Sequence, residues 1–525
     1  MKTDIKQTFF FWLPWIIIAF GFMVRLDQYL FNTSLWLDEA FFAVNVVDRT
    51  FLELFKPPLE YSSYIIPPGF MVMAKLSITL FGNSDLILRL FPFLCSIVSL
   101  ILFYKLAKIY ISAQAVPLAL FLFATSDVLI IYSSMFKQYS SDVMIVIALL
   151  LLVAHLRRNP LTFARLFILS IVGILAVWFS HASVFILATI GIYLILPYLL
   201  NKQWQTVIKL IAVYSLWLLS FAILFFLIIN VETSTNEWMH NFWGRRNAFM
   251  PSPFSIEGFQ WLYDSFLLAI TNPGSLDNVE LVGIVVIIGC ISMLTNRKGF
   301  LFLLTLPVLI ALIVSFFEQY AFYGRLLLFL TPALYLIIAE GIVQFQVKQF
   351  AYPKTSIVTI AIHILLFFSI IDFPLYRRTV HQEIKPVLEY VQENKQANDV
   401  IYLYYWAEPA FRYYANFYDL SYDNCHTIST PPESQYTTEV TYSREKRNLQ
   451  PVDVNETQCI LGISASFHIS LQDLDKLSER GGRVWFIFSH IRGYYRDVFL
   501  KHLDAKGTQL QKKGEKGAFA YLYKL

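Results

Sequence analysis

Long apolar runs recur along most of this chain and restrict what it can fold into. A helix needs roughly 20 apolar residues to cross the hydrocarbon of a bilayer. Runs of about this length lie at residues 9–26, 87–111, 114–134, 141–156, 166–181, 182–200, 209–230, 279–295, 300–317, 324–346 and 355–373. Hydrophobic residues make up 57% of the chain and charged residues 15%, against about 45–50% and about 25% in soluble domains. The sequence therefore predicts an α-helical polytopic membrane protein with about eleven spans.

The loops between these runs differ in charge, and the difference predicts which side each loop faces. Alternate loops hold most of the basic residues of this part of the chain: Lys2, Lys6, Lys105, Lys108, Arg157, Arg158, Arg165, Lys202, Lys209, Arg297, Lys298, Lys348 and Lys354. Acidic residues outnumber basic ones in loop 27–86 of the other set. Because cytoplasmic loops are rich in Lys and Arg, we expect a cytoplasmic N-terminus. Loops 27–86 and 231–278, and everything after 373, are then extracytoplasmic.

Residues 67–81 are apolar but too short to span comfortably, and they begin with Pro67-Pro68-Gly69. An additional crossing here would invert every later loop and break the alternation of charge. We therefore expect a helix that lies in the outer membrane interface.

The composition becomes polar near residue 380, which predicts two domains, 1–379 in the membrane and 380–525 soluble and extracytoplasmic. The second has a helical pattern at 381–394 and strand-like runs at Val400 to Tyr405, Cys459 to Ile463, Arg483 to Ser489 and Ala518 to Tyr523. These features predict a small α/β domain. Cys425 and Cys459 lie in it and can pair if the domain faces an oxidising compartment. The cysteine spacing does not indicate a zinc site.

The segment Trp36-Leu37-Asp38-Glu39-Ala40 places two adjacent carboxylates in the first extracytoplasmic loop. A carboxylate held in a partly apolar surface can have a raised pKa and accept a proton from an attacking hydroxyl. The alternative interpretation is structural, with Asp38 capping a helix whose first turn contains Glu39. Spacing alone leaves both interpretations open.

Several motifs together resemble one family. They are SLWLDEAFFAV at 34–44, Pro67-Pro68-Gly69, Gly82-Asn83-Ser84 leading to Leu88-Arg89-Leu90, Phe136-Lys137-Gln138-Tyr139 and Gly324-Arg325-Leu326. In this order they resemble the bacterial members of glycosyltransferase family 39, relatives of protein O-mannosyltransferases and of lipid A aminoarabinose transferases. The resemblance covers most of residues 1–350. It implies a GT-C fold, a polyprenyl-phosphate sugar donor, Asp38 as the base or acceptor-orienting group and Glu39 as its support.

A departing polyprenyl phosphate needs cations where the hydrocarbon begins. Lys137 and Tyr139 stand in a predicted short extracytoplasmic turn where the relatives often place an Arg-Tyr pair, so Lys137 departs from the commoner pattern. Arg325 begins a later span at the same face. The alternative for Arg325 is ordinary snorkelling at a helix end.

Two further charged residues lie close to the same face. Arg89 leads into the second span, and it either contacts substrate, anchors the helix or pairs with Asp85. Asp142 begins the fourth span as a helix N-terminal carboxylate or as a second acid of the site. The sequence has no metal-binding motif, and an acidic pair offers too few ligands for a committed metal site. We therefore expect no cofactor, with a divalent cation left open.

These inferences predict an integral glycosyltransferase of the bacterial inner membrane that moves a hexosyl or pentosyl group. Its partners are a polyprenyl-phosphate sugar donor, membrane lipids, and a lipid, glycan or protein acceptor. The net charge of +4 without a dense basic run disfavours nucleic acid. The alternative is a transporter or lipid flippase, which would place ionisable groups near the bilayer midplane. The spans here are nearly free of such groups.

Overall fold

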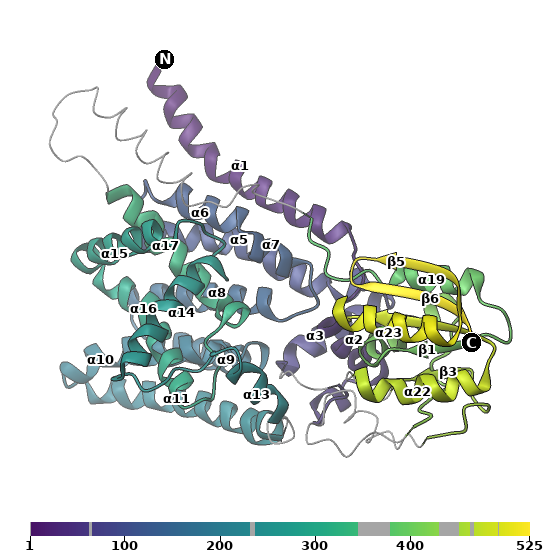
Figure 1. Ribbon diagram of the computed structural model, residues 1–525. Coiled ribbons are helices and arrows are strands. Elements are labelled where there is room, and N and C mark those ends of the chain that lie inside the picture. The colour runs from purple at the N-terminus through teal and green to yellow at the C-terminus, as the bar shows by residue number, and fades with distance from the viewer. Residues whose placement is uncertain are drawn as a thin grey trace.

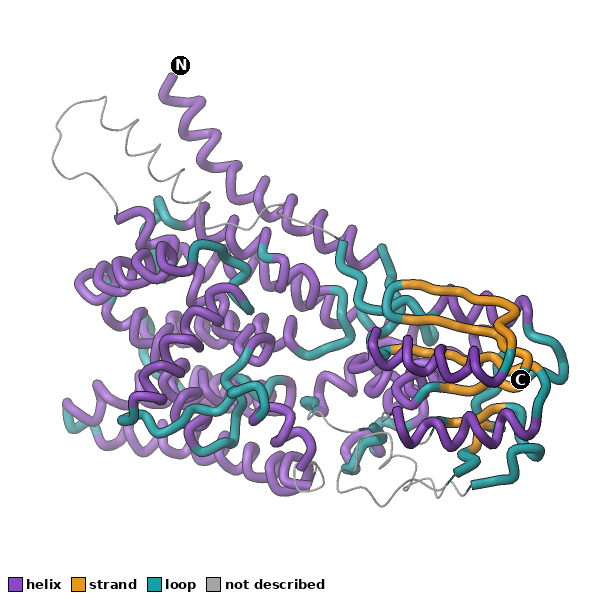
Figure 2. The backbone as a smooth tube through the Cα atoms, in the orientation of Figure 1, coloured by secondary structure: helices purple, strands orange, loops and turns teal. Residues whose placement is uncertain are grey.

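A computed structural model describes residues 2–61, 66–231, 237–344, 378–429, 451–462, 467–491 and 493–525. Its helices form one body, and a sheet with its own helices lies beside the C-terminal end of the first helix, α1 (Lys2–Leu30) (Figure 1). The strands lie together in that second part (Figure 2). The chain thus has a helical part and a C-terminal sheet part.

The helical part contains the following elements: α1 Lys2–Leu30, α2 Leu37–Asp48, η1 Glu53–Phe55, α3 Pro68–Phe81, α4 Asp85–Leu88, α5 Leu90–Tyr110, α6 Val116–Thr125, α7 Asp127–Ser133, α8 Tyr139–Arg157, α9 Phe163–Phe179, α10 Ser183–Leu200, α11 Trp204–Leu224, η2 Phe225–Ile229, α13 Glu237–Gly244, α14 Ile256–Thr271, α15 Val279–Asn296, α16 Lys298–Phe316, η3 Gly324–Leu330 and α17 Thr331–Gln344. Loop 231–278 therefore contains two helices of its own, α13 and α14, within its described residues.

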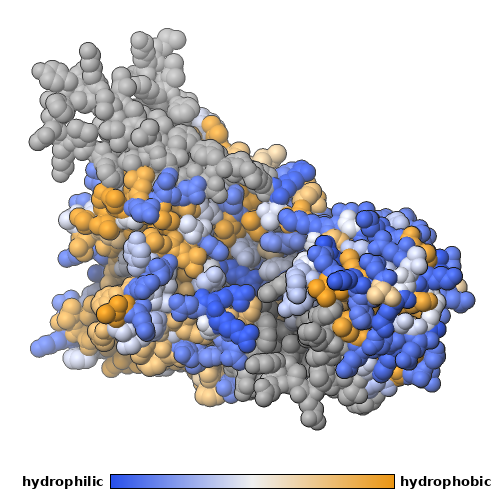
Figure 3. Space-filling model, in the orientation of Figure 1, coloured by the Kyte–Doolittle hydropathy of each residue, from blue (hydrophilic) through white to orange (hydrophobic). Residues whose placement is uncertain are grey.

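Within the described residues, eight helices are long and apolar enough to cross a membrane, or nine if the bent pair α6 and α7 forms one span. Hydrophobic residues gather over the helical part and hydrophilic residues over the sheet part (Figure 3). The prediction of a polytopic membrane protein is confirmed. Of the other predicted spans, 166–181 corresponds to α9, which has only 17 residues, and 355–373 lies outside the described residues.

The predicted span 114–134 is broken rather than continuous, because its two helices meet at an angle of 54°. Ser126 ends α6, and its hydroxyl accepts a hydrogen bond from the Leu129 N–H as the N-cap of α7. Arg25 of α1 donates to the carbonyls of Phe123 and Ala124, which the break leaves without helical partners. The sequence contained this signal in Ser126, which is a good N-cap residue.

The short apolar segment at 67–81 forms a helix with nearly the predicted bounds, α3 (Pro68–Phe81). It has 14 residues and falls below the length of a span, as expected. Gly69 is needed at its start, since a Cβ there would lie 2.7 Å from the ring of Phe179. Its position in the membrane interface stays a prediction.

The sheet has six strands: β1 Val400–Leu403, β2 Cys425–His426, β3 Cys459–Leu461, β4 Arg483–Ser489, β5 Thr508–Glu515 and β6 Ala518–Lys524. Their order is β2-β3-β1-β4-β6-β5, parallel from β2 to β4 and antiparallel for β4-β6-β5. The accompanying helices are α19 Lys385–Asn394, η4 Tyr405–Ala407, α20 Glu408–Tyr414, η5 Ala415–Tyr418, α22 Phe467–Arg480 and α23 Gly493–Lys506. The predicted α/β fold is confirmed, and Cys425 and Cys459 form a disulfide.

Alternate side chains of the strands enter two different cores. Tyr402 and Phe486 pack with Phe499 of α23 on one face. Ile401 and Trp485 belong to a core on the other face that also contains residues of α19, α20 and α2. The helix that carries the acidic pair therefore shares a hydrophobic core with the sheet.

Candidate active site

The acidic pair lies in the first turn of α2, directly beside the sheet part. Trp36 is the N-cap residue, so Asp38 does not cap the helix and that structural interpretation is wrong. Glu39 occupies the third helical position, and its carboxylate accepts a hydrogen bond of 3.0 Å from the Trp36 N–H. This is one half of a capping box. It fixes where α2 begins and hence where Asp38 points.

Both carboxylate oxygens of Glu39 accept hydrogen bonds. Its carboxylate receives two hydrogen bonds from Arg89, of 2.9 and 2.8 Å, and one of 2.5 Å from the Phe136 N–H. Both charged side chains are only 2% exposed. Burial disfavours ionisation of Glu39, but Arg89 outweighs it and holds the pKa of this carboxyl below its usual value. The pair is a buried ion pair that positions the loop.

Arg89 does not pair with Asp85, so that expectation is corrected. Asp85 instead accepts hydrogen bonds from Lys385 and from the hydroxyl of Tyr414, both of the C-terminal part. Arg89 also donates to the carbonyl oxygens of Thr33 and Ser34, just ahead of α2. Arg89 thus pairs with Glu39, and Lys385 pairs with Asp85.

Asp38 meets two cations that lie far from it in sequence. Its Oδ2 atom is 2.8 Å from Nη2 of Arg325 and 3.5 Å from Nζ of Lys137. Lys137 precedes α8 and also lies 4.2 Å from the ring centroid of Phe42. Arg325 stands at the start of η3 with 15% of its side chain exposed. The predicted grouping of Asp38, Lys137 and Arg325 is present.

The electrostatics of this cluster correct one expectation. Burial disfavours the charged form of Asp38, but Lys137 and Arg325 together outweigh it and hold the pKa of the carboxyl below its usual value. The raised pKa expected from the sequence is therefore not found. Burial lowers the pKa of Lys137 to about 7, although Asp38 opposes the shift. Lys137 is thus the group of this cluster that titrates near neutral pH.

Two tyrosines surround the guanidinium of Arg325. Tyr139, the first residue of α8, has its ring centroid 5.9 Å from the Cζ atom of Arg325. Tyr132 of α7 lies close to Arg325 and meets the ring of Tyr139 edge-on, with ring centroids 4.8 Å apart. Tyr132 was missed by the sequence analysis, because it lies inside an apolar run with no polar pattern around it.

Asp142 lies one turn further along α8 and is buried. Its carboxylate lies near Ser180, in the turn between α9 and α10, and its Oδ1 atom is buried without a hydrogen-bond partner in the part of the chain that the structure describes. None of its contacts among the described residues reaches Asp38. Asp142 is therefore near the cluster without belonging to it.

The C-terminal part holds the start of the acidic loop through its own side chains. Gln382 accepts a hydrogen bond from the Leu37 N–H, and the hydroxyl of Tyr414 accepts one from the Leu35 N–H. Glu383 accepts from both the N–H and the hydroxyl of Ser34. These contacts satisfy backbone donors ahead of and within the first turn of α2. The position of Asp38 thus depends on residues about 350 positions later.

The site does not converge as a metal centre. Among the residues that the structure describes, no three His, Cys, Asp or Glu side chains come together. Asp38 faces Arg325 and Lys137, whereas Glu39 faces Arg89. The two neighbouring carboxylates therefore contact different cations rather than one shared point.

The architecture is similar to that of solved membrane proteins. The crystal structure of ArnT from Cupriavidus metallidurans bound to undecaprenyl phosphate aligns over 97% of both chains, with a TM-score of 0.55 and 11% identity. The apo structure of the same protein aligns equally well. This chain has the GT-C fold of ArnT. The oligosaccharyltransferase of Archaeoglobus fulgidus aligns over 96% of this chain and 72% of its own, with 13% identity and a TM-score of 0.48. No family model and no curated protein matches the sequence.

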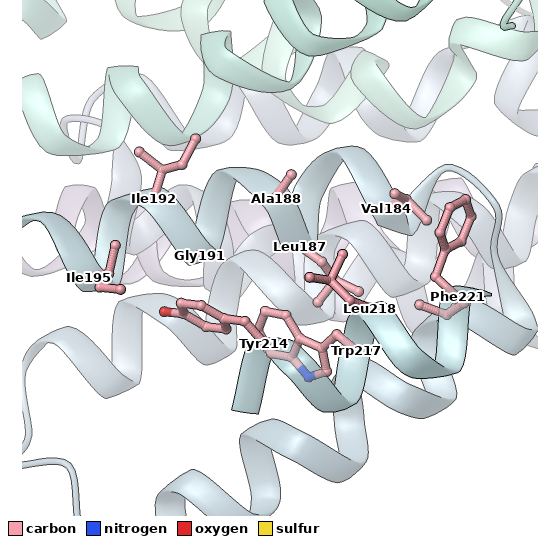
Figure 4. Close-up of a pocket in the computed structure, with 11 residues that line it drawn as sticks. Val184, Leu187, Ala188, Gly191, Ile192, Ile195, Tyr214, Trp217, Leu218 and Phe221 are labelled. Atoms are coloured by element: carbon pink, nitrogen blue, oxygen red, sulfur yellow. The ribbon is translucent and has the colours of Figure 1, made fainter. Parts of the chain in front are cut away.

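A cavity lies between two apolar helices of the helical part. A groove of about 310 Å³ lies between α10 and α11 (Figure 4). Its lining is almost entirely apolar, with Tyr214 and Trp217 on one wall and Leu187 and Gly191 on the other. The groove contains none of the charged residues of the cluster, and we assign it no part in the chemistry.

Proposed function

We propose that this protein transfers a monosaccharide from a polyprenyl-phosphate carrier to an acceptor at the extracytoplasmic face of the bacterial inner membrane. The observation that carries the proposal is the cluster of Asp38, Lys137 and Arg325 at the ends of packed helices. In a glycosyl transfer, a carboxylate can accept the proton of the acceptor hydroxyl, and two cations beside it can stabilise the departing phosphate. The GT-C fold shared with ArnT, which binds undecaprenyl phosphate, supports the same reading.

The reaction is a single displacement at the anomeric carbon. The bond from this carbon to the phosphate oxygen breaks, and the phosphate leaves with the electron pair and one additional negative charge. A bond forms to the acceptor hydroxyl, whose proton passes to Asp38. Lys137 and Arg325 stabilise the charge that develops on the leaving phosphate. If the acceptor is itself a phosphate, no base is needed and Asp38 orients the sugar.

In the free protein Asp38 is the counter-ion of both cations, which makes it a weak base. A bound donor phosphate would compete for Lys137 and Arg325, because it is an anion in the same low-dielectric site. Weakening these ion pairs raises the affinity of Asp38 for a proton. We therefore expect donor binding to activate the base. Glu39 and Arg89, whose contacts are with each other and the backbone, are positioning residues in this mechanism.

The transporter alternative is less well supported by the buried charges within the spans. Arg25 is buried in α1 but donates to Ser96 and to three backbone carbonyls. Glu340 is buried in α17 and accepts hydrogen bonds from the Ser112 N–H and the Ser292 hydroxyl. Both satisfy local structure, whereas Asp38 lies with cations at the ends of helices.

A transfer assay tests the proposed function. Purified protein in detergent is supplied with radiolabelled polyprenyl-phosphate sugars and with lipid and glycan acceptors extracted from a bacterial envelope. We expect label to move from the lipid-phosphate carrier to an acceptor. The absence of transfer from every lipid-linked sugar tried, with folded protein, would rule out the reaction class.

The pH dependence of donor use follows from Lys137. Its pKa of about 7 means that the side chain is charged below pH 7 and neutral above it. A sugar phosphodiester keeps the same charge across this range, so we expect kcat/KM for the donor to fall as the pH rises from 6 to 8.5. Lys137→Arg stays protonated in this range and should remove the fall. A wild-type profile that is flat from pH 6 to 8.5 would contradict the assignment.

A further inference from the structure

Four aromatic rings form a row between the acidic loop and the sheet. Trp36 stacks on His381, with ring centroids 5.1 Å apart. The ring centroid of His490 lies 6.4 Å from that of Trp36. His490 in turn meets Trp406 at 6.5 Å and 76°. We call Trp36, His381, His490 and Trp406 the ring row. Asp38 follows Trp36 by two residues, and His490 is close enough to add to the electrostatic stabilisation of its carboxylate.

The sheet topology explains why two of these rings meet there. Trp406 follows β1 and His490 directly follows β4, and the two strands are parallel neighbours. The chain leaves β1 toward β3 and β2 on one side and later reaches β4 on the other. The carboxyl ends of β1 and β4 therefore form a topological switch point, where α/β sheets bind ligands. Here this point faces the acidic loop.

The backbone of His490 supports a functional interpretation. Its φ angle is +57°, in the left-handed region that only a few per cent of non-glycine residues adopt, histidine more often than most. The conformation turns the chain out of β4, and the His490 N–H donates to the carbonyl of Gly517. Backbone strain of this kind concentrates at functional sites.

The ring row differs from the aromatic residues that form the cores of the sheet part. Tyr402, Tyr405 and Tyr414 are buried in the cores, where their rings serve packing. Trp36 and Trp406 are half-buried, and His381 and His490 are exposed. These rings therefore keep surface that a ligand can cover. Flat apolar faces beside imidazole nitrogens suit a sugar ring, which presents C–H groups and hydroxyls together.

We propose that the ring row is a binding subsite for the sugar ring of a saccharide acceptor. The inference rests on the proposed function and deepens it by naming the acceptor class. Lys137 and Arg325 reach Asp38 from the helical part, and the Cζ atom of Arg325 also lies 5.5 Å from the ring centroid of Trp36. His490 and Trp406, at the other end of the ring row, belong to the sheet part. With the leaving phosphate at the cations, an acceptor on His490 and Trp406 approaches Asp38 from the sheet part. An in-line displacement needs nucleophile and leaving group on opposite sides of the anomeric carbon.

The test compares Trp406→Ala and His490→Ala with the control Tyr494→Ala. Tyr494 is an aromatic residue of the same sheet part, 76% exposed and outside the ring row. In the transfer assay with envelope glycans, we expect the KM for the acceptor to rise about tenfold in each ring-row variant. The KM for the donor, and the slow hydrolysis of the donor by water, should stay within twofold of wild type. Tyr494→Ala should leave all three unchanged.

A second measurement separates this inference from the proposed function. Binding of envelope oligosaccharides to donor-free protein is measured by isothermal titration calorimetry for the same variants. Binding that weakens about tenfold in Trp406→Ala supports the subsite even if no transfer is seen, in which case only the proposed function fails. If wild type binds no oligosaccharide and the ring-row variants keep the wild-type acceptor KM, the subsite is disproved. A rise confined to the donor KM overturns the acceptor assignment.

Discussion

Asp38→Asn is expected to lower kcat for sugar transfer about 10²–10⁴-fold, the usual contribution of a general base. The KM for the donor should stay unchanged or fall. Asp38 holds the two cations at 2.8 and 3.5 Å in the free protein, and a neutral amide no longer competes with the donor phosphate for them. This combination of a large loss in kcat with undiminished donor affinity separates a base from a residue that binds the donor.

Steady-state transfer kinetics with donor and acceptor varied in turn measure both quantities. Asp27→Asn is the matched control, because Asp27 is an exposed carboxylate at the end of α1 that pairs with Arg378. It should change kcat less than twofold. Equal transfer by Asp38→Asn and wild type would remove Asp38 from the chemistry while leaving the reaction class intact. A tenfold rise in donor KM would show instead that Asp38 binds the donor.

The sequence predicted the membrane class and most spans because a run of apolar residues has few alternatives to crossing a bilayer. It also predicted β1, β3, β4 and β6, whose residues are mainly apolar and include β-branched or aromatic ones. It missed both edge strands, the two-residue β2 (Cys425–His426) and β5 (Thr508–Glu515), which has mainly polar residues and pairs only with β6. Such a strand forms because its partner offers backbone hydrogen bonds, and its own residues carry little signal.

The resemblance to the family predicted the residues around Asp38, but it did not predict how the two carboxylates divide their partners. Glu39 was expected to support Asp38, and in the structure its carboxylate accepts hydrogen bonds from Arg89 and from the N–H groups of Trp36 and Phe136. A sequence cannot show which of two adjacent carboxylates meets which cation. The contacts depend on which helix ends the tertiary fold brings together.

The grouping of the four rings of the ring row could not have been predicted from the sequence. Trp36 and His490 are separated by more than 450 positions along the chain, and their rings lie 6.4 Å apart. His490 directly follows a buried strand as an ordinary polar residue would, and its positive φ angle is visible only in the structure. Their proximity depends on how the sheet docks against α2, a contact between surfaces that carry no local pattern in the sequence.

Arg89→Leu is expected to lower the free energy of unfolding by about 3–5 kcal/mol. The change leaves the carboxylate of Glu39 buried without its cation, although the N–H groups of Trp36 and Phe136 still reach it. Arg89→Leu combined with Glu39→Gln should recover more than half of the loss, because no uncompensated charge then remains. Chemical denaturation in detergent, followed by circular dichroism, measures the three values.

The chain offers a control pair with nearly the same geometry and a different environment. Arg378 donates two hydrogen bonds of 2.9 and 2.7 Å to Asp27, as Arg89 does to Glu39, but both partners are exposed. Arg378→Leu should therefore cost only about 0–1 kcal/mol. Equal losses in the free energy of unfolding for Arg378→Leu and Arg89→Leu would show that burial does not account for the contribution of the pair of Arg89 and Glu39. A large loss for Arg89→Leu that Glu39→Gln fails to relieve would instead place the effect in the contacts of Arg89 with Thr33 and Ser34, which fix the start of the acidic loop.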